Sequence, residues 1–279
     1  MPIEQKKHEE IVEKNLGFQS LGLEGEAKRQ KQIKLTNRDL EVLEFCLEMK
    51  FSDLKSIHQK FFFHLQSGNR SKSDWWARER LGILKRHGYL NSKRISFSGS
   101  SYYLATDLAH MALSSLRPSR SFVRPLAEID VRTFEHDRRV IEARLVLESL
   151  GRANNWCSER RLKSESSLTS GLPRMYQPDA IYQNKLGELM AFELELSVKT
   201  KDRYEDKIRK YVDVIRKAET GSPGFLGVLF VVCSYHSFNI LNELTRRFEG
   251  KFKIEKYNEL IVQGSKIESE QGSTQEGVI

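Results

Sequence analysis

Apolar positions in the first part of the chain recur at helical spacing in three short segments, and two β-like segments follow them. A residue that can cap a helix precedes each helical segment: Thr36 or Asn37, Ser52 or Asp53, and Ser73 or Asp74. The third helix is expected over residues 75–87, with Gly88 closing it, and the strands over residues 94–97 and 102–105. Three helices followed by a hairpin predict a winged helix-turn-helix domain over residues 35–117.

Farther along the chain, helical and extended segments alternate, which is typical of an α/β domain. After a break in periodicity, the expected elements are a helix over 131–150, a weak strand over 154–157, strands over 179–182 and 189–196, a helix over 202–217, a strand over 225–233, a helix over 237–248, and strands over 252–256 and 260–262. They predict a second domain over residues 126–263. The fold class is therefore α/β, or α+β when the winged helix is included. Residues 1–34 are predicted as a flexible charged arm and residues 264–279 as a disordered tail, because both are polar.

The overall charge favours a polyanionic partner. The chain carries a net charge of +8, with an isoelectric point near 9.3, which is typical of proteins that meet nucleic acid. The longest apolar run, residues 225–233, is far shorter than the roughly 20 residues that a membrane-spanning helix needs. With no secretory signal at the start of the chain, a cytoplasmic protein without membrane contact is expected.

Six cations lie on the expected third helix and on the wing. They are Arg78, Arg80, Lys85 and Arg86 on the helix, and Lys93 and Arg94 at the wing. A recognition helix packs on one side and faces DNA on the other, so these side chains are the candidate DNA contacts. The alternatives are a solvated face without a partner and a surface for protein contacts.

Large aromatic residues open the same helix. Trp76, Leu81 and Leu84 form an apolar stripe that is expected to pack inward. The pair Trp75 and Trp76 is therefore predicted to belong to the core rather than to a platform on which bases stack.

Three carboxylates are candidates for a divalent-metal site. Asp179 follows Pro178 at the mouth of one strand, and Glu193 and Glu195 lie two residues apart on the next strand. Residues two apart on a strand share a face, so a hairpin could bring the three carboxylates together. Carboxylate oxygens suit Mg²⁺, for which Mn²⁺ can substitute. The alternative is an ordinary half-buried strand with a polar outer face.

The order of these motifs resembles two known groups of proteins. A helix, three strands, a helix and a strand, with Pro178-Asp179 on the second strand and Glu193-Leu194-Glu195 on the third, resembles the restriction-endonuclease-like PD-(D/E)xK nuclease superfamily. More narrowly, a winged helix joined to these motifs is similar to the replication-relaxation family of plasmid and mobile-element proteins. His136 on the preceding helix and the run from Lys207 to Tyr211 on the following helix extend the similarity, which covers residues 35–262.

The resemblance implies a DNA-binding protein of plasmid or mobile-element replication or transfer that carries a nuclease-like domain. The implied activity is Mg²⁺-dependent cleavage of DNA phosphodiesters, as by an endonuclease, with Asp179, Glu193, Glu195 and Lys207 as catalytic residues and the three carboxylates as metal ligands. The third-strand motif should end in lysine, but position 195 is glutamate. Lys199, Lys201 or Lys207 could supply the amine from the next segment, and Lys207 matches best by helix position. His136 or Glu142 could complete the metal shell.

Two other functions remain open at this point. The first is a non-catalytic DNA-binding adaptor of a relaxase or a replication initiator, which the glutamate at position 195 favours. The second is a winged-helix transcription regulator whose second half binds a partner.

Overall fold

The computed structural model of the protein describes residues 33–63, 73–164 and 177–273. Nearly all of the arm predicted for residues 1–34, and the end of the predicted tail, lie outside the described residues. From Lys34 onward the chain forms one compact unit. In the described part of the chain, none of the helices combines the length and the apolar character that crossing a membrane requires.

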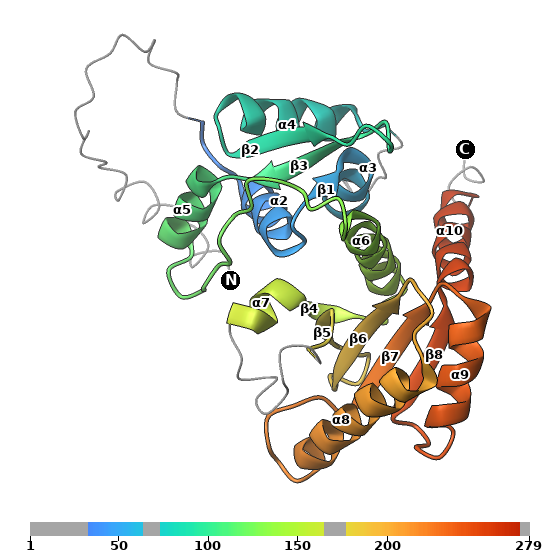
Figure 1. The fold of residues 1–279 in the computed structure, drawn as a ribbon. Helices are drawn as coiled ribbons and strands as arrows, with labels where there is room; N and C mark the ends of the chain where they lie inside the picture. The colour runs from blue at the N-terminus through green and yellow to red at the C-terminus, as the bar shows by residue number, and fades with distance from the viewer. Residues whose placement is uncertain (1–32, 64–72, 165–176, 274–279) are drawn as a thin grey trace. The chain divides into compact units, whose positions relative to one another are not determined.

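The first half is a small helical unit with a three-stranded antiparallel sheet (Figure 1). Its elements in chain order are α2 (Asn37–Glu48), β1 (Ser52–Asp53), α3 (Leu54–Ile57), the π-helical turn η1 (His58–Phe62), α4 (Trp75–Arg86), β2 (Leu90–Arg94), β3 (Ser101–Ala105) and α5 (Asp107–Leu116). The strands lie in the order β1-β3-β2, and β2 and β3 form the hairpin. The three helical segments and the hairpin follow the predicted order, but the short strand β1 was not predicted, and β2 lies over Leu90–Arg94 instead of residues 94–97.

Side-chain caps explain where these helices begin. The Thr36 hydroxyl accepts a hydrogen bond from the Asp39 amide, and the Asp39 carboxylate accepts one from the Thr36 amide, which completes a capping box at α2. The Asp53 and Thr106 side chains each accept one hydrogen bond from a backbone amide in the first turn of α3 and of α5. Gly88, which follows the C-cap of α4, has a φ of 77°, a conformation that glycine adopts without strain.

The second half is built on a five-stranded mixed sheet. Its elements are α6 (Phe134–Ser149), β4 (Asn154–Ser158), α7 (Glu159–Ser164), β5 (Ala180–Gln183), β6 (Leu189–Glu195), α8 (Lys201–Glu219), β7 (Gly227–Val232), α9 (Tyr235–Thr245), β8 (Phe252–Lys256) and α10 (Tyr257–Ser273). The strands lie in the order β4-β5-β6-β7-β8; β4, β5 and β6 pair antiparallel, and β6, β7 and β8 pair parallel. The α/β fold class is therefore confirmed.

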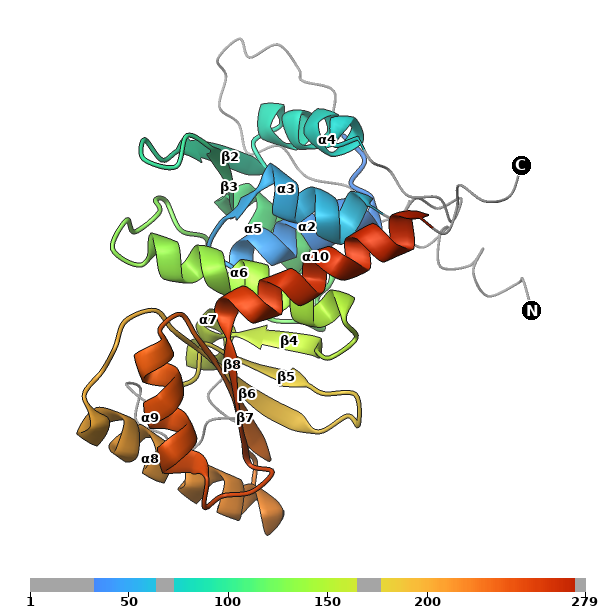
Figure 2. The same cartoon turned by 90° about the vertical axis from the view of Figure 1, so that its right-hand side faces the viewer.

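Helices cover both faces of this sheet. Helices α6 and α10 lie on one face, and α8 and α9 lie on the other (Figure 2). Along the central strand β6, Phe192 and Leu194 join the core under α6, whereas Ala191 joins the core under α8. Glu193 and Glu195 share the parity of Ala191, so the alternation of the strand directs both carboxylates toward α8.

The end of the chain differs from its prediction. The strand expected over residues 260–262 is wrong, because these residues lie in α10, which runs to Ser273. The same helix takes the place of the disorder expected for residues 264–273, and the rest of the predicted tail lies outside the described residues. Leu260 and Ile261 pack into the core beside α6, and Gly264 lies against Val146: a Cβ at Gly264 would be 2.7 Å from the Val146 Cγ2. A short apolar run does not distinguish a strand from a helix, and here the packing against α6 decides in favour of the helix.

The two halves share one hydrophobic core. Phe134, the first residue of α6, stacks on Phe51 with ring centroids 5.3 Å apart. It also meets the edges of Tyr102 and Phe97 from the β2–β3 hairpin, at 5.0 and 5.4 Å. The stretch between the two predicted domains, residues 118–125, thus separates two sequence patterns but not two cores. Residues before it and residues after it pack together.

Candidate functional site

The two glutamates of β6 lie in the interior. Glu193 is 3% exposed and Glu195 is 2% exposed, because α8 covers the face of the sheet toward which they point. The strand is therefore buried on both faces, unlike the half-buried strand with a wet outer face that the sequence also allowed. Buried carboxylates are costly unless charged or hydrogen-bonding groups meet them.

Lys207 and Tyr211, one turn apart on α8, supply those groups. The Lys207 Nζ lies 2.6 Å from the Glu193 Oε2 and 3.1 Å from the Glu195 Oε1, so one amine bridges both glutamates. The Tyr211 hydroxyl donates a hydrogen bond to the Glu193 Oε1. A second amine, the Lys199 Nζ, lies 2.5 Å from the Glu195 Oε2.

The three lysines that the sequence left open thus differ in their contacts. Lys207 contacts both glutamates, and Lys199 contacts Glu195. Lys201 instead pairs with the exposed Glu243, at 2.8 Å. Lys207 is therefore the candidate amine that lies within the carboxylate cluster.

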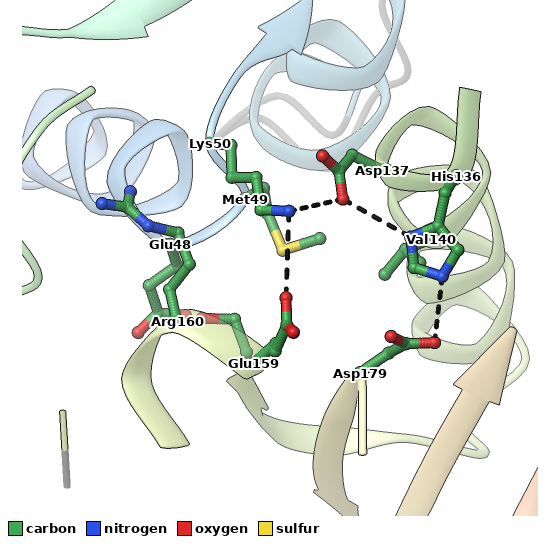
Figure 3. A pocket seen from close by; sticks show the side chains of 10 residues that line it. Glu48, Met49, Lys50, His136, Asp137, Val140, Glu159, Arg160 and Asp179 are labelled. Carbon is green, nitrogen blue, oxygen red and sulfur yellow. Dashed lines mark hydrogen bonds and ion pairs between the residues drawn. The ribbon is translucent and has the colours of Figure 1, made fainter. Parts of the chain in front are cut away.

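Asp179 lies immediately before β5 and is held by two donors. Its Oδ2 accepts a hydrogen bond of 2.8 Å from the Leu194 amide, and the His136 Nε2 lies 3.2 Å from the same oxygen. His136 sits in the first turn of α6, and its Nδ1 lies 3.4 Å from the Asp137 Oδ1. Asp137 in turn accepts a 2.7 Å bond from Lys50, so a polar chain runs from the end of α2 to Asp179 (Figure 3).

Burial and close charges shift the pKa values in this cluster. Burial raises the pKa of Glu193 to about 7, against the opposing effect of Lys207. Burial alone would lower the pKa of Lys207, but Glu193 and Glu195 hold it above its usual value. Strongly perturbed groups gathered in one place mark a candidate functional site, and ion-pair networks with a structural role have the same signature.

The histidine and aspartate pair shows the same competition. Burial would lower the pKa of His136, but hydrogen bonds and charge from Asp137 and Asp179 raise it to about 10. For Asp179, burial acts to raise the pKa, and the contacts with His136 outweigh it, so the pKa is lowered. The pair is thus arranged as an imidazolium beside a carboxylate.

The donor chemistry suits a divalent cation, but the arrangement does not. Carboxylate oxygens are the ligands that Mg²⁺ prefers. In this structure, however, Lys207 engages Glu193 and Glu195, while His136 and a backbone amide engage Asp179. Within the described residues, His, Cys, Asp and Glu side chains form no group of three that could hold a metal ion. The site as arranged therefore does not fit a bound metal.

Glu142, the other residue named for a metal shell, lies outside this cluster. Its carboxylate accepts hydrogen bonds from Arg138 and from the Tyr257 hydroxyl of α10. Lys50 and Asp137 were not foreseen as part of the site. They are 87 residues apart in the sequence, and only the packing of α2 against α6 brings them together.

The six cations predicted to contact DNA differ in solvent exposure and in their ion pairs. Five of the six cations are exposed: Arg78, Lys85, Arg86, Lys93 and Arg94. Among them, Arg78 also pairs with the exposed Asp74, at 2.8 Å. Arg80 differs, because its guanidinium makes a two-point ion pair with the buried Asp39, at 2.7 and 2.5 Å. Arg80 therefore fastens α4 to the start of α2.

The prediction that Trp75 and Trp76 belong to the core is wrong. Trp75 is 51% exposed and Trp76 is 59% exposed. The buried face of α4 consists of Ala77, Leu81 and Leu84. Trp76 precedes Ala77 by one residue, which turns it about 100° away from that face, so it lies at the flank of the helix.

The chain thus joins a helical unit with a three-stranded sheet to an α/β half, whose central strand carries Glu193 and Glu195 beside Lys207. A profile of the replication-relaxation family matches residues 43–229, which is more than half of the chain, and the chain belongs to this family. The match runs from within α2 to within β7. No curated protein matches the chain. Membership suggests a role in plasmid or mobile-element replication or transfer.

Proposed function

We propose that the protein serves plasmid or mobile-element replication or transfer by binding DNA through α4 and the β2–β3 hairpin. The observation that carries this proposal is the set of exposed cations on these two elements: Arg78, Lys85, Arg86, Lys93 and Arg94. Exposed lysines and arginines on a recognition helix and wing are placed to neutralise phosphates. Glu79 is the one exposed acid among the residues of α4.

In this proposal the α/β half is a non-catalytic scaffold that joins the DNA-binding half to a relaxase or a replication initiator. The contacts of Lys207 support it. One amine supplies, between Glu193 and Glu195, the positive charge that a metal ion would otherwise bring. The shared core around Phe134 would then transmit the orientation of the scaffold to the DNA-binding half.

A second candidate, metal-dependent cleavage of DNA phosphodiesters, is favoured by one specific observation. Asp179, Glu193, Glu195 and an amine from α8 gather at one place, as the PD-(D/E)xK resemblance implies. Cleavage would require a rearrangement of the site, because the carboxylates are engaged by Lys207 and His136.

DNA binding is tested with two double variants that remove the same charges from equivalent places. Lys85→Ala/Arg86→Ala removes the basic residues of the last turn of α4, and Arg216→Ala/Lys217→Ala removes those of the last turn of α8. Fluorescence anisotropy with a labelled DNA duplex should show a loss of roughly tenfold or more in affinity for the first variant. The second should bind like the wild type. Equal affinities for the wild type and both variants would refute the proposed surface.

Cleavage is tested with supercoiled plasmid in the presence of Mg²⁺ or Mn²⁺. The scaffold proposal predicts that neither the wild type nor Asp179→Ala nicks the plasmid. Nicking by the wild type that Asp179→Ala abolishes would establish the second candidate instead. Equal nicking by both proteins would place the activity outside this site.

A further inference from the structure

Two indoles at the start of α4 lie outside the core formed by the residues that the structure describes. Trp75 and Trp76 are the first two residues of the helix, and each exposes more than half of its surface. Their ring contact is with each other, edge to face, with centroids 4.5 Å apart. Exposed apolar surface of this size is unfavourable in water and often marks a binding site.

Their place on the helix points toward DNA. In a helix-turn-helix domain, the N-terminal residues of the recognition helix are the ones that approach base edges. Arg78 follows Trp75 by one turn and is 62% exposed, so a cation flanks the indoles. Positive charge beside exposed aromatic rings is the combination by which proteins bind unpaired bases, because every base offers a flat face for stacking.

A cavity adjoins Trp76. It has a volume of about 580 Å³, and its walls include Arg38, Phe62 and Arg80. The guanidinium of Arg38 lies over the Phe62 ring, with 5.0 Å to the centroid. A flat ring that stacks on Trp76 can therefore enter a space whose lining includes the Arg38 guanidinium and the Asp39–Arg80 ion pair.

Gly82 is an independent observation that a ligand backbone could approach α4 closely on the same side of the helix. It lies seven residues, or about two turns, after Trp75, so both point outward. Among the described residues, a Cβ at Gly82 would meet the Arg86 Nη1, at 3.8 Å, which is an ordinary contact that does not require glycine. Glycine in a helix interior lowers stability relative to alanine. A missing side chain on the outer face does, however, let an external backbone approach closely.

We propose that Trp75 and Trp76 stack on unpaired DNA bases, so that the protein binds DNA with locally separated strands more tightly than intact duplex. This inference rests on the proposed function, since α4 must face DNA. Intact duplex keeps its bases stacked on one another, whereas separated strands expose base faces that two indoles and a flanking arginine can cover. The substrate class is therefore DNA that contains a short unpaired region.

The test uses the full chain and three labelled DNAs of one sequence: a duplex, the same duplex with a short central bubble, and the single strand. The wild type should bind the bubble more tightly than the duplex. Trp75→Ala/Trp76→Ala should weaken binding to the bubble by roughly tenfold and change binding to the duplex little. Tyr235→Ala, which removes a 67% exposed aromatic side chain from the start of α9, should change neither.

Intrinsic fluorescence gives a second readout. The chain has three tryptophans, and the third, Trp156, is 5% exposed. Unlabelled bubble DNA should quench the fluorescence more strongly than duplex, and Trp156→Phe should retain this quenching. Stacking on exposed indoles predicts this response, whereas phosphate contacts alone do not.

The outcomes separate the two proposals. Failure to bind any of the three DNAs would overturn the proposed function and this inference with it. Binding to duplex without a preference for the bubble, or an equal loss of both affinities in the tryptophan variant, would overturn the stacking inference alone. Unchanged binding of all three DNAs by that variant would also overturn it and would assign the indoles to a protein partner.

Discussion

The amine of Lys207 stands between two glutamates that are almost fully buried. Removing one partner of a buried ion pair leaves uncompensated charge in the interior, which is far more destabilising than losing an exposed pair. At the scale of single residues, the stability of the α/β half should therefore depend on this contact.

Lys207→Met should lower the free energy of unfolding by about 3–5 kcal/mol, because it leaves Glu193 and Glu195 without their shared cation. Lys201→Met is the matched control on the same helix, since Lys201 pairs with an exposed glutamate. Its effect should be much smaller, because an exposed ion pair contributes little to stability. Urea denaturation at neutral pH measures both, and similar small losses would contradict the structural role of Lys207.

The imidazole of His136 should remain protonated well above neutral pH. Burial opposes this, but Asp137 and Asp179 raise its pKa to about 10 from the usual 6.5. The stability contributed by a raised pKa is complete below about 6.5 and is lost as the pH rises through about 10. An NMR titration should show no deprotonation of His136 between pH 6 and 8, and Asp137→Asn should lower its pKa. A titration centred near 6.5 in the wild type would contradict the arrangement.

Part of this site could be predicted from the sequence. Side chains alternate along a strand, so Glu193 and Glu195 were expected on one face. Lys207 was preferred among three lysines because of its position on the next helix. The contact of Lys50 with Asp137 could not be predicted, because it depends on how α2 packs against α6. The direct contact of the Lys207 amine with both carboxylates also depends on how α8 packs on the sheet.

At the scale of elements, the periodicity of apolar residues and the capping residues predicted most helices and strands. Where these predictions failed, tertiary packing had determined the structure. Thr36, Asp53 and Thr106 begin helices as their residue types suggest. The α10 helix was not predicted because its second half is polar and its apolar run is short. Its contacts with α6 stabilise the helix. Trp76 was assigned to the core because apolar character alone does not give its direction around the helix.

Alanine substitutions at two helical glycines should change the free energy of unfolding in opposite directions. Gly82→Ala should raise the free energy of unfolding by about 0.5–1 kcal/mol, because the new methyl group makes only an ordinary van der Waals contact with the Arg86 side chain. Gly264→Ala should lower it by about 1–3 kcal/mol, because the methyl group would overlap Val146 where α10 crosses α6. Denaturant midpoints of the two variants and the wild type measure both signs. A stabilising effect at Gly264 would contradict the close packing of α10.

At the scale of the whole molecule, the shared core should make the two halves unfold together. Phe134 begins the second half and packs among aromatic rings of the first. Phe134→Ala should lower the free energy of unfolding by about 3–5 kcal/mol. Val131→Ala, a nearby exposed position, should change it by less than about 0.5 kcal/mol.

Circular dichroism and tryptophan fluorescence should report one coincident transition in the wild type. Two separated transitions would show that the halves are independent and would contradict the shared core. One cooperative unit suits the proposal that the first half binds DNA and the α/β half keeps a fixed orientation relative to it.

Salt dependence of DNA affinity tests the central claim most directly. Each phosphate neutralised by the protein adds about 0.9 to the slope of log affinity against log salt concentration. The wild type should show a steep loss of duplex affinity with salt, and Lys85→Ala/Arg86→Ala should reduce the slope by about 2. Arg216→Ala/Lys217→Ala should keep the wild-type slope. A flat dependence in the wild type, or an unchanged slope in the α4 variant, would contradict DNA binding through this surface.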